Sequence, residues 1–219
     1  MELYEAMRST PAMRSFKPDP VPRDVLRRVL DNARFAPSGG NRQGWRVVAV
    51  ESPEGRRRLR ELYVPHWEAY TQATGARALL DAPAPVEGVS ARRLQMLRNA
   101  DDFAHHLDDV PLHLVVCAEL AALALVDRVL DRPSIVGGAS IYPFVQNILL
   151  GSRAEGLGTS LTTIITAAEE DVRTLLGLPR GIAVAALVAV GSPAAPWPTK
   201  LSRRPLEEFA FAERWGESL

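Results

Sequence analysis

The stretch Ala36-Pro37-Ser38-Gly39-Gly40-Asn41-Arg42-Gln43-Gly44-Trp45-Arg46 leads directly into the apolar run Val47–Val50. Its two adjacent glycines permit backbone conformations and close approaches that a Cβ would forbid. Polar side chains lie close to these glycines, at Ser38, Asn41, Arg42 and Gln43. Such a loop can surround a flat, polar ligand with backbone and side-chain donors. Because Pro, Ser, Gly and Asn also form ordinary turns, the stretch alone leaves both interpretations open.

The chain on either side of this loop predicts a core of strands covered by helices. Apolar runs predict strands at Trp45–Glu51, Leu112–Glu119 and Ile182–Val190, and the last run is apolar enough to be buried on both faces. Apolar residues at helical spacing predict helices near 2–8, 54–73, 94–107, 121–131 and 169–176, and between Pro22 and Pro37. These elements predict an α+β protein, an α/β-type three-layer sandwich forming a single domain over residues 1–219.

The most regular helical pattern lies in the second half of the chain. Its apolar stripe consists of Ile141, Phe144, Val145, Ile148 and Leu149. We expect Ser140 or a neighbouring residue to cap the start of this helix. The residues that follow it, 159–164, are predicted to form a polar loop. Residues 74–90 are rich in Ala, Pro and Gly, and they predict a loop that could cover a substrate.

Composition excludes several classes of partner. Lys and Arg together number 26, as do Asp and Glu, so the formal net charge is zero and does not favour nucleic acid. The sequence has no apolar run long enough for a membrane span and does not start with a signal-peptide pattern, so we expect a cytoplasmic protein with no membrane partner. The one cysteine, Cys117, lies in an apolar run and is expected to be a buried, inert thiol.

Sequence motifs of several common enzyme classes are missing. The chain has no glycine-rich dinucleotide motif, no Walker-type motif and no Gly-x-Ser-x-Gly. Its four histidines, His66, His105, His106 and His113, lack metal-ligand spacing, so solvated or core histidines and no metal site are expected. With neither a nucleophile nor a metal signalled, a cofactor that carries the chemistry itself is the economical hypothesis.

Three ordered segments resemble one family. These are Arg14-Ser15-Phe16 with the prolines that follow it, the Ala36–Trp45 stretch, and Gly138–Pro143 continued through Gly156–Thr163. In this order and spacing they are similar to the FMN-dependent nitroreductase family, over about residues 4–216. The resemblance implies a nitroreductase-like fold, with a central mixed sheet flanked by helices, in an intertwined homodimer that binds FMN at the subunit interface.

The resemblance also implies which residues bind FMN. Arg14 matches a basic position of the phosphate-binding segment, and Arg203 matches the basic tail pair, with Lys200 and Arg204 as further candidates. Ser38 and Asn41 match the flavin-contacting loop, and Gln43 follows them. Thr162, Thr163 and Ile164 match the loop whose backbone faces the isoalloxazine ring. The chain departs from the family at Thr10-Pro11-Ala12, where basic residues are usual, so Arg8 is a candidate substitute, and at Gly44, where proline is usual.

The C-terminal residues 194–219 form the last notable segment. They carry Trp197, Phe209, Phe211 and Trp215, rings that need a surface against which to be buried. Another subunit is the natural candidate, so this segment is expected to be an extension that packs on the partner.

The expected activity is that of an oxidoreductase that uses NAD(P)H as co-substrate. Hydride would pass through flavin N5 to a nitroaromatic, a quinone or a related small-molecule electrophile, in a ping-pong sequence in which no protein side chain acts as a catalyst. The family also includes members that fragment flavin, dehalogenate aromatic substrates or oxidise azolines, and the sequence leaves these reactions open. A flavin-binding module without turnover and a non-flavin protein that interacts through its aromatic tail are the alternatives from other classes.

Overall fold

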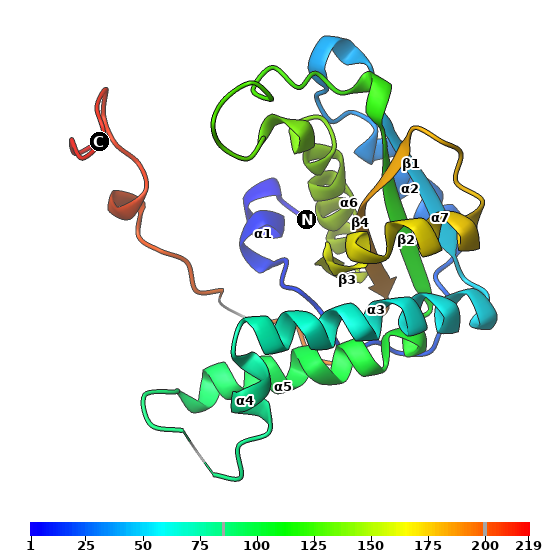
Figure 1. The fold of residues 1–219 in the computed structure, drawn as a ribbon, viewed down its shortest axis with the longest axis vertical. Helices are drawn as coiled ribbons and strands as arrows, with labels where there is room; N and C mark the ends of the chain where they lie inside the picture. The colour runs from blue at the N-terminus through cyan, green and yellow to red at the C-terminus, as the bar shows by residue number, and fades with distance from the viewer. Residues whose placement is uncertain (85, 199–200) are drawn as a thin grey trace.

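In a computed structural model that describes residues 1–84, 86–198 and 201–219, the core is an antiparallel sheet with the strand order β1-β2-β4-β3 (Figure 1). Its strands are β1 (Trp45–Val50), β2 (Leu112–Glu119), β3 (Gly158–Thr162) and β4 (Ile182–Gly191). The three predicted strands are thereby confirmed. The mixed sheet implied by the resemblance is not seen, because every strand pair among the described residues is antiparallel.

Strand β3 replaces part of the polar loop that the sequence predicts for residues 159–164. Its sequence, GTSLT, has little apolar content, yet Thr159 and Ser160 are each only 3% exposed. These polar residues are buried because β3 pairs with β4 on one side and accepts a hydrogen bond from Met13 on the other. Such long-range pairing satisfies backbone groups without leaving a pattern in the local sequence.

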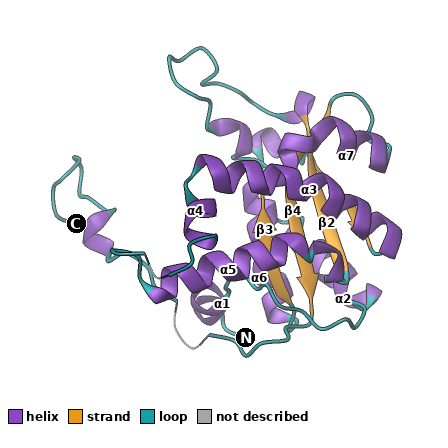
Figure 2. Ribbon diagram, turned by 60° about the horizontal axis from the view of Figure 1, so that its bottom comes forward, coloured by secondary structure: helices purple, strands orange, loops and turns teal. Residues whose placement is uncertain are grey.

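The described residues also form seven α-helices (Figure 2). They are α1 (Leu3–Ser9), α2 (Arg23–Ala33), α3 (Pro53–Ala73), α4 (Ala76–Leu80), α5 (Ala91–His105), α6 (Tyr142–Ala154) and α7 (Glu169–Leu176). Six of these confirm predicted helices, although the sequence places α5 a few residues too late. Helix α4 lies in the segment that was predicted to be a loop.

Two local predictions for the residues that precede α6 are wrong. The helix predicted near 121–131 is absent from the described structure, where only a 3₁₀ turn, Leu120–Ala122, forms. The carboxylate of Asp127 instead accepts hydrogen bonds from Ser134 Oγ and the Ile135 amide, which holds this segment as a loop. Ser140 does not cap α6, because its Oγ accepts a hydrogen bond from the Gly39 amide, 3.0 Å away.

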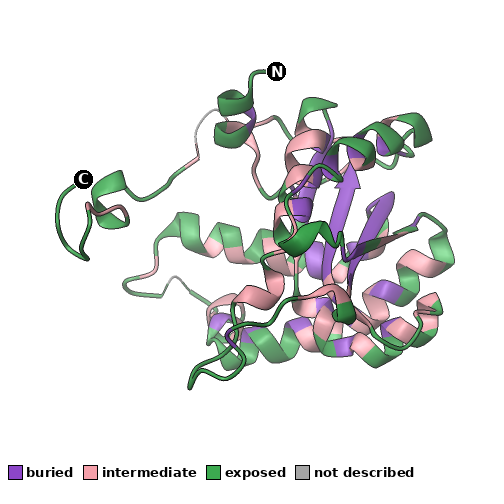
Figure 3. Ribbon diagram, turned by 90° about the horizontal axis from the view of Figure 1, so that it is seen from above, coloured by how far each residue is buried: buried purple, intermediate pink, exposed green. Residues whose placement is uncertain are grey.

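Helices cover both faces of the sheet, which confirms the three-layer architecture. Along β2, Leu112, Leu114, Val116 and Ala118 pack with α2 and α6, whereas Val115 and Cys117 pack with α3, α5 and α7. The two inner strands are therefore buried on both faces, as their colouring in Figure 3 shows. The resulting rigid sheet positions the loops at its two ends.

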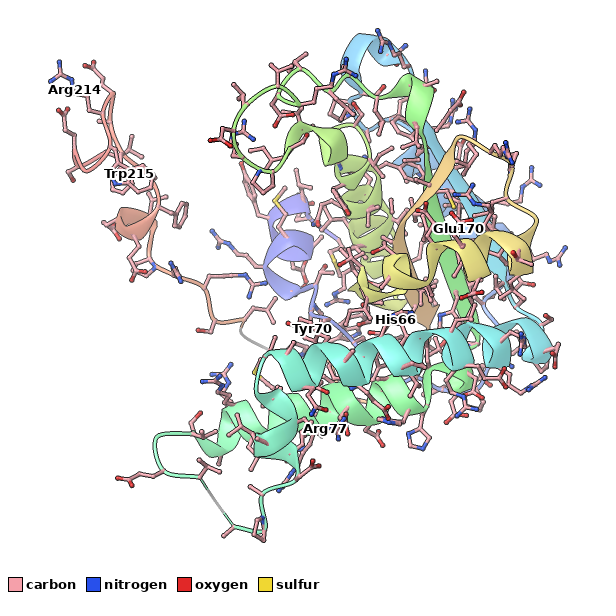
Figure 4. All side chains as sticks on the ribbon, viewed as in Figure 1. His66, Tyr70, Arg77, Glu170, Arg214 and Trp215 are labelled. Atoms are coloured by element: carbon pink, nitrogen blue, oxygen red, sulfur yellow. The ribbon has the colours of Figure 1, made fainter. Side chains whose placement is uncertain are left out.

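The described residues of the C-terminal segment beyond 201 project away from this body (Figure 1). Trp215 is 92% exposed, and its side chain and that of Arg214 lie far from the sheet (Figure 4). Its ring contacts that of Phe211, with centroids 4.9 Å apart. Whether residues 194–219 pack on a partner, and whether 1–219 is one domain, stay predictions.

Candidate functional site

One set of predicted residues meets where the segment Met13–Lys17 runs beside the sheet edge. The Met13 amide donates to Thr159 O over 2.8 Å, and the Lys17 amide donates to Ser192 O over the same distance. Gly158 allows this approach, since a Cβ there would lie 2.8 Å from Met13 Cγ. We call residues 13–17, Tyr63 and residues 159–164 the Arg14 corner.

Arg14 is the cation of this corner. Its side chain is half-buried, burial lowers its pKa, and it makes no ion pair with any carboxylate among the described residues. The hydroxyl of Tyr63 lies close enough to interact electrostatically with it and is hydrogen-bonded to Thr162 Oγ1, 3.0 Å away. Thr162 Oγ1 also accepts from the Ile164 amide over 3.3 Å. The structure thus brings Arg14, Thr162 and Ile164 together.

Tyr63 was not predicted as a site residue. The sequence places it on the inward face of a helix, where it appears only as a core residue. It is 2% exposed, and burial raises the pKa of its hydroxyl. A buried tyrosine needs a hydrogen-bond partner for its hydroxyl, and this requirement was the available signal.

Two cavities flank Arg14. One, of about 300 Å³, is lined by Arg14, Ser15, Phe16, Asp102, Phe103, His106, Asp109 and Val110. The other, of about 400 Å³, is lined by Pro11, Ala12, Met13, Arg14, Ser15, Asn99, Asp102, Ala195, Pro196 and Pro198. Asp102 borders both cavities, and its carboxylate lies 3.1 Å from His106 Nδ1. A half-buried guanidinium without a carboxylate partner at such a cavity is suited to bind an anion.

The glycine-rich stretch forms a second cluster, which we call the Ser38 corner and define as residues 38–44 with Ser140. Three of its residues have left-handed φ values: Gly40 at 59°, Asn41 at 52° and Gln43 at 49°. Ser38 Oγ accepts from the Gln43 amide over 3.0 Å, and Gln43 Nε2 donates to Asn41 Oδ1 over 3.1 Å. The predicted ligand-binding side chains therefore also hold the loop in this conformation, with Asn41 and Gln43 exposed.

Gly44 has a structural reason to be glycine. A Cβ at this position would lie 2.7 Å from Ala122 Cβ, closer than real Cβ contacts allow. Proline, the family's usual residue here, carries such a Cβ, so the loop at 120–122 explains the departure.

The two corners lie at opposite corners of the sheet. Trp45, which directly follows the Ser38 corner, pairs with Ala118 at one end of β2. Thr159 pairs with Val190, which lies level with Leu112 at the other end of β2. With β1 and β3 as opposite edges, strand spacing and rise place Thr159 about 25 Å from Trp45. One chain therefore does not bring Ser38, Asn41 and Gln43 to Arg14.

The remaining predicted residues lie outside both cavities. Arg8 is exposed in the last turn of α1, and Thr163 is exposed beside β3. Arg203 and Arg204 lie on the projecting C-terminal segment, where Arg204 makes only a 3.9 Å contact with Glu208 among the described residues. Lys200 falls outside the described residues.

The other titratable candidates are structural. His113 is fully buried, its Nε2 lies 2.8 Å from Leu107 O, and burial lowers its pKa to about 4. Burial raises the pKa of the Cys117 thiol to about 11, consistent with the inert cysteine that the sequence predicts.

In the described ranges, no group of three or more His, Cys, Asp or Glu side chains could hold a metal ion. No helix of the described chain is long and apolar enough to cross a membrane.

Comparison with known proteins defines the class. Residues 7–192 match the model of the nitroreductase family. A relative named NADH dehydrogenase, from Thermus thermophilus, is 33% identical over 191 residues, which cover 84% of this chain and 82% of the relative. The chain therefore belongs to the nitroreductase family, a flavoprotein family, and the family and this relative place it among oxidoreductases.

Solved structures show the same fold. A BluB-like flavoprotein from Clostridium difficile 630 superposes with a TM-score of 0.71 at 18% identity, covering 98% of this chain and 100% of that one. An iodotyrosine deiodinase, solved with bound FMN and 3-iodo-L-tyrosine, has a TM-score of 0.65 at 23% identity, covering 93% of this chain and 96% of that one. At these identities the likeness establishes the nitroreductase fold.

Proposed function

We propose that the protein is an FMN-dependent oxidoreductase that takes hydride from NAD(P)H and delivers it to a nitroaromatic, a quinone or a related electrophile. The observation that carries the proposal is Arg14, a half-buried cation with no carboxylate partner among the described residues. It borders a cavity of about 400 Å³ and lies beside the Thr162–Ile164 loop. Membership in the nitroreductase family and the FMN bound to the deiodinase of the same fold support this choice of cofactor.

The residues of the Arg14 corner fit such a cofactor. The Arg14 guanidinium offers forked donors to a phosphate or to the electron-rich edge of a flavin. The Thr162–Ile164 backbone, held by Tyr63, would lie along the isoalloxazine ring. When bound, FMN supplies the two-electron chemistry at N5, first as hydride acceptor and then as donor, which makes a ping-pong sequence the expected one.

We further propose that the site is completed by a second copy of the chain. The Ser38 corner, at the opposite corner of the sheet from Arg14 within one chain, would contribute its Ser38, Asn41 and Gln43 donors to the partner's flavin. The projecting segment that ends beyond Trp215 would pack on the same partner and bring Arg203 and Arg204, with Lys200, toward the phosphate. A homodimer with two shared sites follows from this arrangement.

The absorption spectrum of the purified protein tests the proposal. We expect a yellow protein with a flavin band near about 450 nm, which bleaches when NADH or NADPH is added anaerobically and returns when an electrophile follows. A colourless protein that takes up no FMN on titration would overturn the proposal.

A flavin-binding module without turnover is the second candidate, and Thr10-Pro11-Ala12 is the observation that favours it. Thr10 Oγ1 donates to Ala6 O over 2.7 Å, so this hydroxyl is already engaged, and Pro11 has no amide to offer. Bound FMN whose band neither nicotinamide bleaches would support this candidate. A colourless dimer would instead favour a protein that interacts through its aromatic tail.

A further inference from the structure

His106 is a titratable group beside Arg14 that the proposed function does not use. It is the C-cap residue of α5, and it lines the cavity of about 300 Å³ together with Arg14. Nothing in the sequence separates His106 from its neighbour His105, and both are predicted to be solvated or core histidines. The structure separates them, because His105 lines neither of the cavities that flank Arg14.

The two neighbouring imidazoles also make different contacts. His105 uses both ring nitrogens, since Nδ1 lies 2.8 Å from Asp101 O and Nε2 lies 3.4 Å from Glu68 Oε1 on α3. His106 Nδ1 lies 2.9 Å from Asp102 O and 3.1 Å from Asp102 Oδ1. His106 Nε2 makes no hydrogen bond or ion pair with any of the described residues. One ring nitrogen of His106 is therefore free for a proton or a ligand.

The contacts with Asp102 fix the tautomer of His106. A carbonyl oxygen and an ionised carboxylate only accept hydrogen bonds, so Nδ1 carries a hydrogen and donates it. In the neutral imidazole Nε2 is then an acceptor, and protonation turns it into a second donor. The side chain is 61% exposed, so water can supply and remove this proton. An oriented ring with a free nitrogen at a cavity has the geometry of a group that takes up protons.

The carboxylates near His106 favour its charged form. Asp102 and Asp109 line the same cavity, and Asp108 lies beside Asp109 in the 3₁₀ turn Leu107–Asp109. The hydrogen bond to the backbone of Asp102, followed by the charges of the three carboxylates, raises the pKa of His106 above its ordinary 6.5. The position at the C-terminal end of α5 acts in the same direction.

Arginines face the same turn from other elements. On α3, Arg60 Nε lies 3.2 Å from Asp108 Oδ1, and Arg56 Nη1 donates to Asp108 O over 2.8 Å. Arg14 lines the cavity itself. With His106 neutral, the lining of the cavity carries one cation against two carboxylates. A negative charge that develops there is therefore stabilised by protonation of His106, which gives the lining a second cation.

We propose that His106 is the proton-uptake residue of this site, and that its Nε2 gains a proton from water when negative charge develops in the ligand beside Arg14. Resting on the proposed function, this charge is the one on the electron-rich edge of reduced FMN. A hydride brings two electrons and one hydrogen to FMN, so the ring keeps one negative charge. The proton that balances this charge is bound by His106 rather than by the flavin.

The number of protons taken up on reduction tests the proposal. FMN-loaded protein is reduced stepwise with a reference dye, and its midpoint potential is measured from about pH 7.5 to 9, where an ordinary histidine is neutral. The slope of potential against pH gives the protons bound per two electrons. We expect the wild-type protein to bind more than one, approaching two near the lower pH, and His106→Gln to bind one. His105→Gln, which removes the neighbouring imidazole outside the cavity, is the matched control and should behave as wild type.

Nuclear magnetic resonance of the His106 ring provides a second measurement on the unaltered protein. The pKa of His106 should rise when bound FMN is reduced with dithionite, because a negative charge then lies near the ring. This measurement decides the question if His106→Gln does not fold or does not retain FMN.

The outcomes separate this inference from the proposed function. Proton uptake that falls to one in His106→Gln and not in His105→Gln supports the inference. Equal uptake in wild type and His106→Gln overturns it, as does a pKa of His106 that does not change on reduction, and both results leave FMN as the cofactor. Wild-type protein that binds no FMN overturns the proposed function, and the inference falls with it.

Discussion

The Arg14 corner and the Ser38 corner are built in opposite ways. The Arg14 corner is held by backbone hydrogen bonds to the ends of β3 and β4, and it carries a half-buried cation and a buried tyrosine. The charged side chain of the Ser38 corner, Arg42, is exposed, and left-handed residues and internal hydrogen bonds shape an exposed loop there. The first corner offers charge on a rigid frame, and the second offers neutral donors on a shaped backbone.

Under the proposed function, neither corner is a complete site. An anionic, flat ligand needs both cations and neutral donors, and the chain places these at opposite corners of the sheet. Two copies related by a twofold axis could bring the Arg14 corner of one protomer to the Ser38 corner of the other.

The largest effect is expected on the free energy of unfolding, and it comes from His113, at the end of the sheet that carries the Arg14 corner. Burial lowers the pKa of His113 from an ordinary 6.5 to about 4, so the unfolded chain binds a proton between these values while the folded protein does not. The contribution of neutral His113 to the free energy of unfolding is therefore fully present above pH 6.5. The free energy of unfolding falls by about 3 kcal/mol as the pH drops toward 4. Urea unfolding of wild-type and His113→Gln proteins over this range measures it. Equal pH dependence of the two proteins would show that His113 is not responsible.

The next effect concerns the partner that is expected to join the corners. Trp215→Ala should raise the dimer dissociation constant by about 30-fold, or about 2 kcal/mol, because large aromatic residues dominate interface energetics. The ring is 92% exposed in the single chain, so the stability of the protomer should change little. Sedimentation over a range of concentrations measures the dimer, with Arg214→Ala as a neighbouring control. Dimers of unaltered affinity would place the tail outside the interface.

A third variant tests the cation of the Arg14 corner. Arg14→Ala should weaken FMN binding by about 1–3 kcal/mol, because a charge-assisted hydrogen bond is lost. Titration of apoprotein by isothermal calorimetry gives the affinity. Arg27→Ala, which removes an exposed charge on α2, serves as the control. An unchanged affinity would remove Arg14 from the site.

The smallest effect separates backbone from side chain in the Ser38 corner. Asn41 has a φ of 52°, a conformation that costs alanine about 1 kcal/mol and glycine almost nothing. If the side chain also binds flavin, Asn41→Gly should still lose FMN affinity although its loop conformation is kept. FMN titration of Asn41→Gly and Asn41→Ala distinguishes the two roles. Full affinity in Asn41→Gly would leave Asn41 only a conformational role.

Local patterns in the sequence predict much of the fold, and long-range pairing explains the rest. The apolar runs of β1, β2 and β4 and the stripe on α6 are buried where their periodicity indicates. Strand β3 could not be predicted, because Met13 and β4 provide its hydrogen bonds. The loop around Asp127 differs from the predicted helix because one carboxylate gathers donors from residues that follow it.

The candidate site could be predicted only in part for a similar reason. The resemblance pointed to Arg14, Thr162 and Ile164, which the structure places together. Tyr63 lies on a helix whose pattern indicates only packing, and its relation to the site arises from a contact across the fold. The separation of the two corners follows from strand order, which the sequence does not specify.

We propose that each flavin site combines the Arg14 corner of one protomer with the Ser38 corner of the other. Arg14→Glu and Ser38→Glu variants, each expected to lose FMN as homodimers, are co-expressed with different tags and the heterodimer is purified. One of its two sites then carries both substitutions, and the other carries neither. We predict about one FMN per heterodimer, read from its absorption spectrum. A heterodimer without FMN would contradict this arrangement, because it would show that both corners must be intact in the same chain.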